Sequence, residues 1–147
     1  MTGFEYTRIF VDTAPFIYLL EDNEHYIAKM QNIFTRLVEN NISLFTSAIT
    51  FEEYLVHPYQ TQQTEKEAAF LDFIQDADIR IITIDVDVAK AAAKIRAKHR
   101  SFKAMDALQL AAAVQWGCDA FLTNDKQLQT FTGIKCLLVD EYKGDQF

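Results

Sequence analysis

The chain has 147 residues, half of them hydrophobic, and carries a formal net charge of −7. This length suits one domain, expected over residues 1–147 with its core at about 8–139. Four glycines and two prolines are too few for a disordered chain. No apolar run is long enough to span a membrane, and we expect no secretory signal at the N-terminus. The acidic balance disfavours an extended phosphate-binding surface that works without metal ions.

The cysteines and histidines form no recognisable site. Cys118 and Cys136 match no metal-binding or redox spacing, so we expect reduced core thiols in a cytoplasmic protein. The three histidines are not grouped with one another or with the acids, and we expect surface or capping roles for them: His25, His57 and His99.

The first expected element is a strand over residues 9–11, an uninterrupted apolar run of the kind that is buried on both faces. The run ends abruptly at Asp12. Pro15 can then open a helix, because its missing N–H is not needed in the first turn. Asp12 therefore stands at the carboxyl end of a central strand, where open α/β sheets place their ligands.

Expected helices and strands alternate along the rest of the chain. A helix begins after Thr46 or Ser47 and ends at His57–Pro58, because a residue before proline is pushed out of the α region. Gly117 stands where a left-handed cap ends a helix. Apolar periodicity predicts further helices over 24–39, 65–75 (with Phe70, Leu71 and Ile74 inward), 86–99 and 104–116, and a short helix or turn over 126–131. Apolar runs predict strands over 42–45, 79–84, 120–122 and 136–139.

This alternation predicts the fold class. Strands that alternate with helices favour an α/β domain whose parallel sheet is covered by helices on both faces. Right-handed crossovers then leave few topologies. Residues 59–64 are expected to form a loop, and the polar tail from Asp140 is expected to be frayed.

Four acids occupy comparable places in this scheme. Asp12 ends the first strand, and Asp125 follows the fourth. Glu53 lies one to two turns into the helix after the second strand, and Asp106 lies at the start of the helix over 104–116. The carboxyl ends of parallel strands share one edge with the helix starts that follow them. We therefore expect Asp12, Glu53 and Asp125 to converge. Asp106 joins them if the start of its helix points at that edge.

Such a cluster predicts a metal site. Close carboxylates repel, and some take up protons unless cations compensate them. Oxygen ligands without neighbouring cysteine or histidine favour Mg²⁺ or Mn²⁺ over Zn²⁺. One or two ions would fit, and two ions about 3.5–4 Å apart can drive phosphodiester cleavage. Each acid taken singly is explained by an exposed carboxylate or a helix-dipole charge, but their joint placement favours the metal site.

Four sequence blocks resemble those of a known family. The blocks are FVDTA at 10–14, TSAITFEE at 46–53, MDALQLA at 105–111 and LTND at 122–125. Together they resemble the PIN-domain nucleases, and most nearly the VapC-type toxins of bacterial toxin–antitoxin pairs, over about residues 9–139. The second block is looser than the others, and Glu53, rather than Glu52, falls where the family has its second acid.

The resemblance implies a fold and an activity. The implied fold is a three-layer α/β/α domain with a five-stranded parallel sheet of order 3-2-1-4-5. The implied activity is that of a Mg²⁺- or Mn²⁺-dependent endoribonuclease, often a homodimer, inhibited by a small antitoxin protein. The four acids match the family's metal-binding catalytic quartet. Thr123 matches the hydroxyl residue before the fourth acid, which we assign to catalysis, and Thr13 matches the polar neighbour of the first acid, which we assign to substrate binding.

A basic stretch precedes Asp106. Lys90, Lys94 and Lys98 recur at four-residue spacing and share one helix face. We expect Lys94, Lys98 and Lys103 to steer RNA phosphates toward the acids. A solvated helix face explains the stripe equally well, and an acidic antitoxin could use the same surface. Between 88 and 105 there are no acids and six basic residues: Lys90, Lys94, Arg96, Lys98, Arg100 and Lys103.

Other functions compete with the nuclease. A catalytically silent module of the same fold would bind RNA or protein without metal-dependent turnover, but the complete quartet argues against it. A phosphatase of the haloacid dehalogenase type needs a second Asp two residues after the first, where this chain has Ala14. P-loop and dinucleotide sites lack their glycine patterns here. Ser47 has no His–acid pair to make it a nucleophile.

Overall fold

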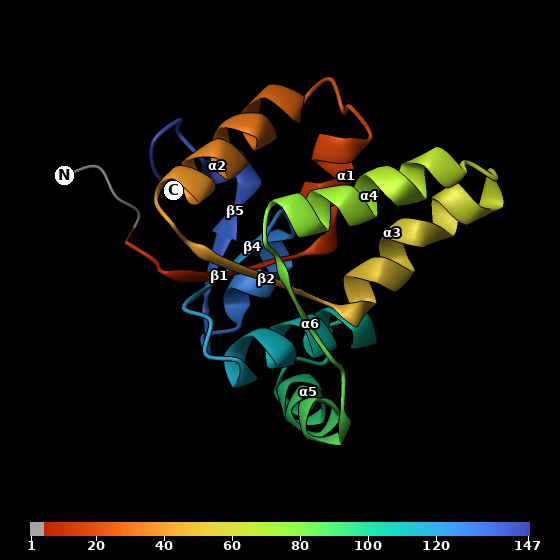
Figure 1. Ribbon diagram of the computed structural model, residues 1–147. Helices are drawn as coiled ribbons and strands as arrows, with labels where there is room; N and C mark the ends of the chain where they lie inside the picture. Colours follow the sequence, from red (N-terminus) through yellow and green to blue (C-terminus); the bar gives the residue numbers. More distant parts are fainter. Residues whose placement is uncertain (1–4) are drawn as a thin grey trace.

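The computed structural model describes residues 5–147. Five parallel strands form one sheet in the order β3-β2-β1-β4-β5, with β1 in the centre (Figure 1). This result confirms the expected fold class and strand order. The strands are β1 (Arg8–Val11), β2 (Ser43–Ser47), β3 (Arg80–Ile82), β4 (Ala120–Thr123) and β5 (Lys135–Leu138).

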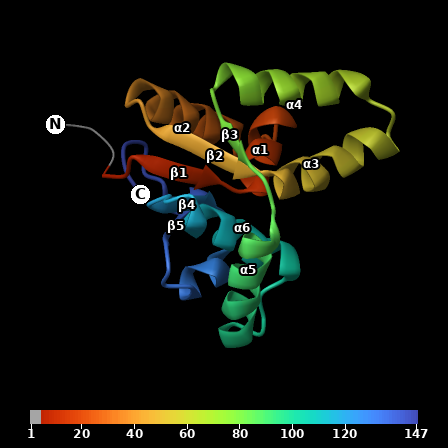
Figure 2. The same cartoon turned by 60° about the horizontal axis from the view of Figure 1, so that its bottom comes forward.

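Helices cover both faces of this sheet. Figures 1 and 2 show α1 to α4 on one side and α5 with α6 on the other, which makes three layers. Among residues 5–147, no helix combines the length and apolar character needed to cross a membrane. The helices are α1 (Thr13–Leu20), α2 (Ile27–Glu39), α3 (Ala48–Gln60), α4 (Thr64–Asp76), α5 (Val86–Lys98) and α6 (Ala104–Gln115), with short 3₁₀ turns η1 (Lys126–Thr130) and η2 (Val139–Glu141).

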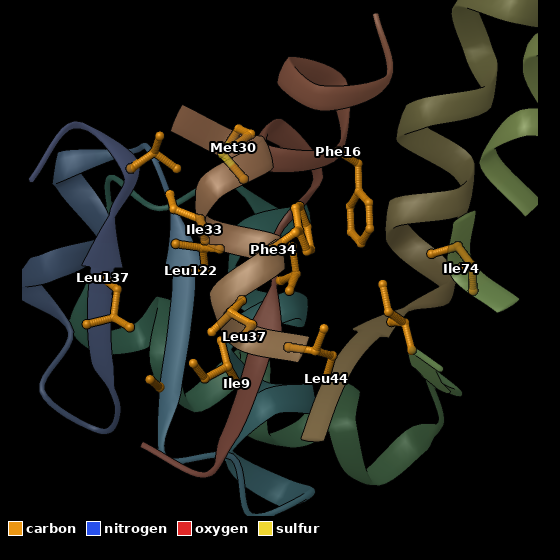
Figure 3. Packing of buried hydrophobic residues seen from close by; sticks show 14 of the residues in the cluster. Ile9, Phe16, Met30, Ile33, Phe34, Leu37, Leu44, Ile74, Leu122 and Leu137 are labelled. Atoms are coloured by element: carbon orange, nitrogen blue, oxygen red, sulfur yellow. The ribbon is translucent and has the colours of Figure 1, made fainter. Parts of the chain in front are cut away.

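The side chains of the central strand, β1, belong to two hydrophobic clusters. Successive side chains of a strand point to opposite faces, so Ile9 and Val11 join one cluster while Phe10 joins the other. Phe10 stacks on Phe121 of β4 with ring centroids 5.2 Å apart. Burial on both faces explains why residues 9–11 of this strand are all apolar. Figure 3 shows the cluster under α2, which includes Ile9, Met30, Ile33, Phe34, Leu37, Leu44, Leu122 and Leu137.

Two helix boundaries differ most from those expected, and the others lie within two residues of them. The second helix begins at Ile27 rather than at 24, because the Asn23 side chain accepts hydrogen bonds from the backbone N–H groups of His25 and Tyr26 and holds a turn there. The third helix does not end at His57–Pro58. It runs to Gln60 with Pro58 buried inside its last turn, where a proline removes only one helical hydrogen bond.

The tail is also better packed than expected. Tyr142 is 5% exposed and packs into the cluster under α2, and its hydroxyl bonds to Asn32 and to the carbonyl of Gly144. This aromatic anchor holds a segment that its polar neighbours suggested was frayed. On α4, Phe70 and Ile74 are buried as expected, whereas Leu71 is 43% exposed.

Both cysteines lie in the interior. Cys118 and Cys136 are buried and form no disulfide. Burial raises the pKa of Cys118 to about 12 and that of Cys136 to about 11. They are core thiols, as expected, and their raised pKa values keep them protonated at neutral pH.

Candidate active site

Asp12 lies at the junction of β1 and α1. Its backbone is extended and its N–H donates to the Leu122 carbonyl of the neighbouring strand at 2.9 Å. Its side chain caps α1 by accepting from the Thr13 N–H at 2.8 Å. A carboxylate is a favourable cap because it pairs with orphan N–H groups and the positive end of the helix dipole. The sheet topology thus places the first acid at the carboxyl edge, 8% exposed.

Three neutral donors hold the Asp12 carboxylate. Oδ1 accepts from the Thr13 N–H and from Gln109 Nε2 of α6, the latter at 3.4 Å. Oδ2 accepts from the Thr123 hydroxyl at the end of β4, at 2.8 Å. The donors come from three different elements. The carboxylate is therefore fixed in position by the fold rather than by its own rotamer preference.

Two threonines join Asp12 to other acids. Thr13 Oγ1 donates to Glu53 Oε1 at 2.6 Å, while the Thr13 backbone N–H donates to Asp12. Thr13 therefore bonds to both Asp12 and Glu53. Thr123 Oγ1, besides donating to Asp12, accepts from the backbone N–H of Asp125 at 3.2 Å. Both threonines are buried. The contacts of Thr13 thus serve the acids, and its contact with a substrate stays a prediction.

Asp106 completes the group from the other face of the sheet. It lies in the first turn of α6, and its pKa is raised by burial and by the charges of Asp125 and Glu53, with Lys103 acting in the opposite direction. Its charge also acts on Asp12. The start of α6 therefore points at the shared edge, as the expected convergence required.

The electrostatics of the site are unfavourable for four ionised carboxylates. The pKa of Asp12 is raised to about 6, first by burial and further by the charges of Asp106 and Glu53. Hydrogen bonds from the Thr13 N–H and the Thr123 hydroxyl lower it, but burial outweighs them. Lys103 is the basic group that offsets charge at Asp106. The site consequently has a surplus of negative charge that a cation would neutralise.

The donor chemistry fits a hard divalent ion. Within residues 5–147, no three acidic, histidine or cysteine side chains form a ready-made cage. Mg²⁺ does not need one, since proteins usually hold it through one or two carboxylates while waters and substrate phosphates complete its shell. Carboxylate oxygens without histidine or cysteine, combined with surplus charge, match that mode of binding.

A buried polar layer beneath the acids was missed in the sequence. Gln109 is 1% exposed, and it bonds to Ser47, Thr50 and Asp12. Ser47 also caps α3, as expected, by accepting from the Ile49 N–H. The signal was present, because Gln109 interrupts an otherwise apolar face of α6.

The basic residues divide into two groups. Lys103 precedes α6, and its charge lowers the pKa of Asp106, so it lies near the acids. Lys94 and Lys98 are exposed on α5, which packs against α6 on the outer side (Figure 2). Within residues 5–147, no hydrogen bond or ion pair joins these two lysines to the acids.

Comparison with known proteins decides the family. The model of the PIN domain family matches residues 9–133. The chain belongs to the PIN domain family. No curated protein sequence matches it.

The fold is shared with toxin–antitoxin proteins. A chain of VapBC2 from Rickettsia felis, bound to a DNA fragment from its promoter, superposes with a TM-score of 0.74 and 16% identity, covering 90% of this chain and 98% of that one. VapC20 from Mycobacterium tuberculosis, a toxin that cleaves the sarcin–ricin loop, gives 0.66 and 17%, covering 86% and 98%. FitAcB from Neisseria gonorrhoeae gives 0.67 and 21%, covering 91% and 99%.

Proposed function

We propose that this PIN domain is a metal-dependent endoribonuclease and the toxin of a type II toxin–antitoxin pair. The observation that carries the proposal is the convergence of four acids from four elements on one edge, with Asp12 buried and its pKa raised to about 6. Membership of the PIN family and the fold shared with VapC20 support a nuclease acting on nucleic acid.

The proposed roles follow from the contacts. Asp12, Asp106 and Asp125 would hold Mg²⁺ or Mn²⁺, and Glu53 would bind a second ion or orient the attacking water. A bound ion supplies an activated water and neutralises charge that builds up on the leaving oxygen. Attack in line on the phosphodiester would leave 5′-phosphate and 3′-hydroxyl ends.

The two threonines would keep these acids in place during the reaction. Thr123 holds Asp12 Oδ2 and bonds to the Asp125 N–H, so it maintains the spacing between the first and fourth acids. Thr13 maintains that between Asp12 and Glu53. Because the like charges repel, this network prevents them from spreading before an ion binds.

Cleavage of total cellular RNA tests the activity. Purified protein is incubated with Mg²⁺, with Mn²⁺ or with EDTA, next to the Asp12→Asn variant. We expect discrete fragments that require metal and disappear in the variant. Absence of cleavage by folded protein free of any partner would instead favour the silent binding module.

The substrate surface would include the lysines of α5 together with Lys103. Replacing Lys94 and Lys98 by Gln should weaken RNA binding and reduce the slope of log K against log salt by about 0.7 for each phosphate that is no longer neutralised. Lys135→Gln is the matched control, because this exposed lysine begins β5 at the opposite edge of the sheet. Filter binding between 50 and 200 mM salt, as rough limits, measures the slope. A slope unchanged in the double variant would assign the stripe to a partner or to solvent.

The proposed partners come from the structural neighbours. The VapBC2 structure and a Klebsiella pneumoniae toxin–antitoxin complex share this fold, so we propose a small antitoxin for this chain. We also propose that residues 1–147 act as one domain, as a homodimer in the cytoplasm. Light scattering after size-exclusion chromatography, with and without the product of an adjacent gene, tests the dimer and the antitoxin.

A further inference from the structure

The polar layer beneath Asp12 has one central side chain. We propose that Gln109 is a positioning residue of the metal site, whose amide fixes the orientation of the Asp12 carboxylate. This inference rests on the proposed nuclease function, and it adds a residue that lies outside the acidic quartet.

The donors and acceptors around Gln109 determine the orientation of its side-chain amide. Ser47 Oγ accepts from the Ile49 N–H at 3.1 Å, so its own proton is available for Gln109 Oε1. With the amide oxygen held there, Nε2 must face the opposite way, toward Thr50 Oγ1 at 2.7 Å and Asp12 Oδ1 at 3.4 Å. A flipped amide would direct an oxygen at the carboxylate and leave Ser47 without an acceptor, which is costly in a buried site.

The remaining hydroxyls form a connected group around Thr50 Oγ1. Thr46 Oγ1 lies 2.9 Å from both the Val11 carbonyl oxygen and Thr50 Oγ1, and Thr13 Oγ1 lies 3.3 Å from Thr50 Oγ1. Thr50 Oγ1 then accepts from Gln109. Each residue in this group is buried, and Gln109 Oε1 accepts from Ser47. Gln109 consequently has a single satisfied orientation rather than two.

The same side chain connects the elements that carry three acids. Gln109 lies one turn after Asp106 on α6. Its partner Thr50 lies one turn before Glu53 on α3, and its other partner, Asp12, ends β1. The 3.4 Å contact with Asp12 is long for a strong hydrogen bond, so Gln109 adds little binding energy to the carboxylate. Its role is instead to fix the direction in which the carboxylate points, which a metal ligand requires.

Mn²⁺ binding without RNA separates this role from simple core packing. Gln109→Met keeps the length of the side chain and removes its donor. The matched control is Gln115→Met, an exposed residue of the same helix that donates to the Asp87 carbonyl. Calorimetry should show Mn²⁺ affinity falling about 10–100-fold in Gln109→Met and unchanged in the control.

Kinetics provide the second readout. In Gln109→Met, kcat at limiting Mn²⁺ should fall and recover as Mn²⁺ is raised, whereas the KM for RNA stays constant because the buried amide does not touch the substrate. A folded Gln109→Met that binds Mn²⁺ as tightly as the wild type would overturn the inference while leaving the nuclease intact. A wild type that binds no Mn²⁺ would overturn the proposed function and this inference with it.

A second pair of variants covers the case in which Gln109→Met does not fold. Ser47→Ala removes the group that orients the amide without touching an acid, so it should also weaken Mn²⁺ binding. Ser47→Thr retains both the cap and the donor and should restore binding. Equal Mn²⁺ affinity in Ser47→Ala and the wild type would overturn the inference.

Discussion

Two aspartates lie at opposite edges of the same sheet, Asp119 at the amino edge and Asp12 at the carboxyl edge. Asp119, just before β4 at the amino edge, accepts from the Thr7 N–H at 2.9 Å, the Thr7 hydroxyl at 3.0 Å and the Arg8 N–H at 3.0 Å. Asp12, at the carboxyl edge, also accepts from one backbone N–H and one threonine hydroxyl, together with an amide. By their hydrogen bonds alone, the two carboxylates are nearly equivalent.

Their surroundings differ. Asp119 is exposed to water and faces the start of β1, where it satisfies N–H groups that have no strand partner. Asp12 is buried beside Asp106 and Glu53, and its hydrogen bonds do not offset that burial. The comparison teaches that hydrogen bonding does not distinguish a structural carboxylate from the one that we propose to be functional. Burial next to like charge does, because such strain persists only where the fold enforces it.

Neutralising each aspartate should separate the two roles most strongly. Asp12→Asn should reduce cleavage by about 10³-fold or more. The same change should raise the free energy of unfolding at pH 8 without metal by up to about 3 kcal/mol, because it removes a charge whose pKa burial has raised. Asp119→Asn should do the opposite, retaining cleavage and losing about 0.5–1.5 kcal/mol. Urea denaturation and a fluorescent RNA assay measure both; loss of cleavage in Asp119→Asn would remove the distinction.

The pH dependence of stability should carry the signature of Asp12. Its folded pKa of about 6 lies above the ordinary 3.8, so the folded state binds the extra proton. Stability without metal should therefore fall as pH rises from about 4 to about 6, and stay low above it. The raised pKa of Asp106 acts in the same direction. Urea melts in EDTA at several pH values should show this fall in the wild type and less of it in Asp12→Asn.

Mn²⁺ should reverse that loss at neutral pH. Binding to the folded state alone stabilises it by about 2.7 kcal/mol when the ion is at 100 times its Kd. For the pH dependence in EDTA, parallel stability profiles of the wild type and Asp12→Asn would show that Asp12 does not cause the fall in stability.

The threonine hydroxyls offer a smaller and more exact contrast. Thr123→Val removes the donor to Asp12 Oδ2 and the acceptor of the Asp125 N–H, so Mn²⁺ affinity or cleavage should fall about 10–100-fold. Thr7→Val removes the matching donor to Asp119 and should leave both unchanged, with stability within about 0.5 kcal/mol. Equal effects of the two variants on Mn²⁺ binding would contradict the assignment of Thr123.

The sequence predicted most of the fold because its local signals agreed with the tertiary structure. The apolar run ending at Asp12 became the central strand, and Gly117 has the left-handed φ of 73° expected after α6. Convergence of Asp12, Glu53 and Asp125 followed from parallel topology, since strand ends share an edge whatever the side chains are. Asp106 lies on a helix that follows another helix, so its approach to that edge depended on the tertiary structure.

The misses have physical causes that a linear pattern does not contain. Pro58 stays helical because the end of a helix tolerates it, and the tail is held by one tyrosine that packs against α2. Gln109 escaped notice because its importance lies in partners that are distant in sequence. Helical periodicity marks such a position as inward, but it does not tell which polar groups meet there.

The interior position of the two cysteines has a practical consequence for testing these ideas. Cys118 and Cys136 are buried, with pKa values raised to about 12 and about 11, so thiol reagents at neutral pH find no reactive native site. A Lys94→Cys variant would accordingly accept a maleimide spin label at a single place on α5. The paramagnetic broadening between that label and Mn²⁺ would then report the distance from α5 to the bound ion in otherwise unaltered protein.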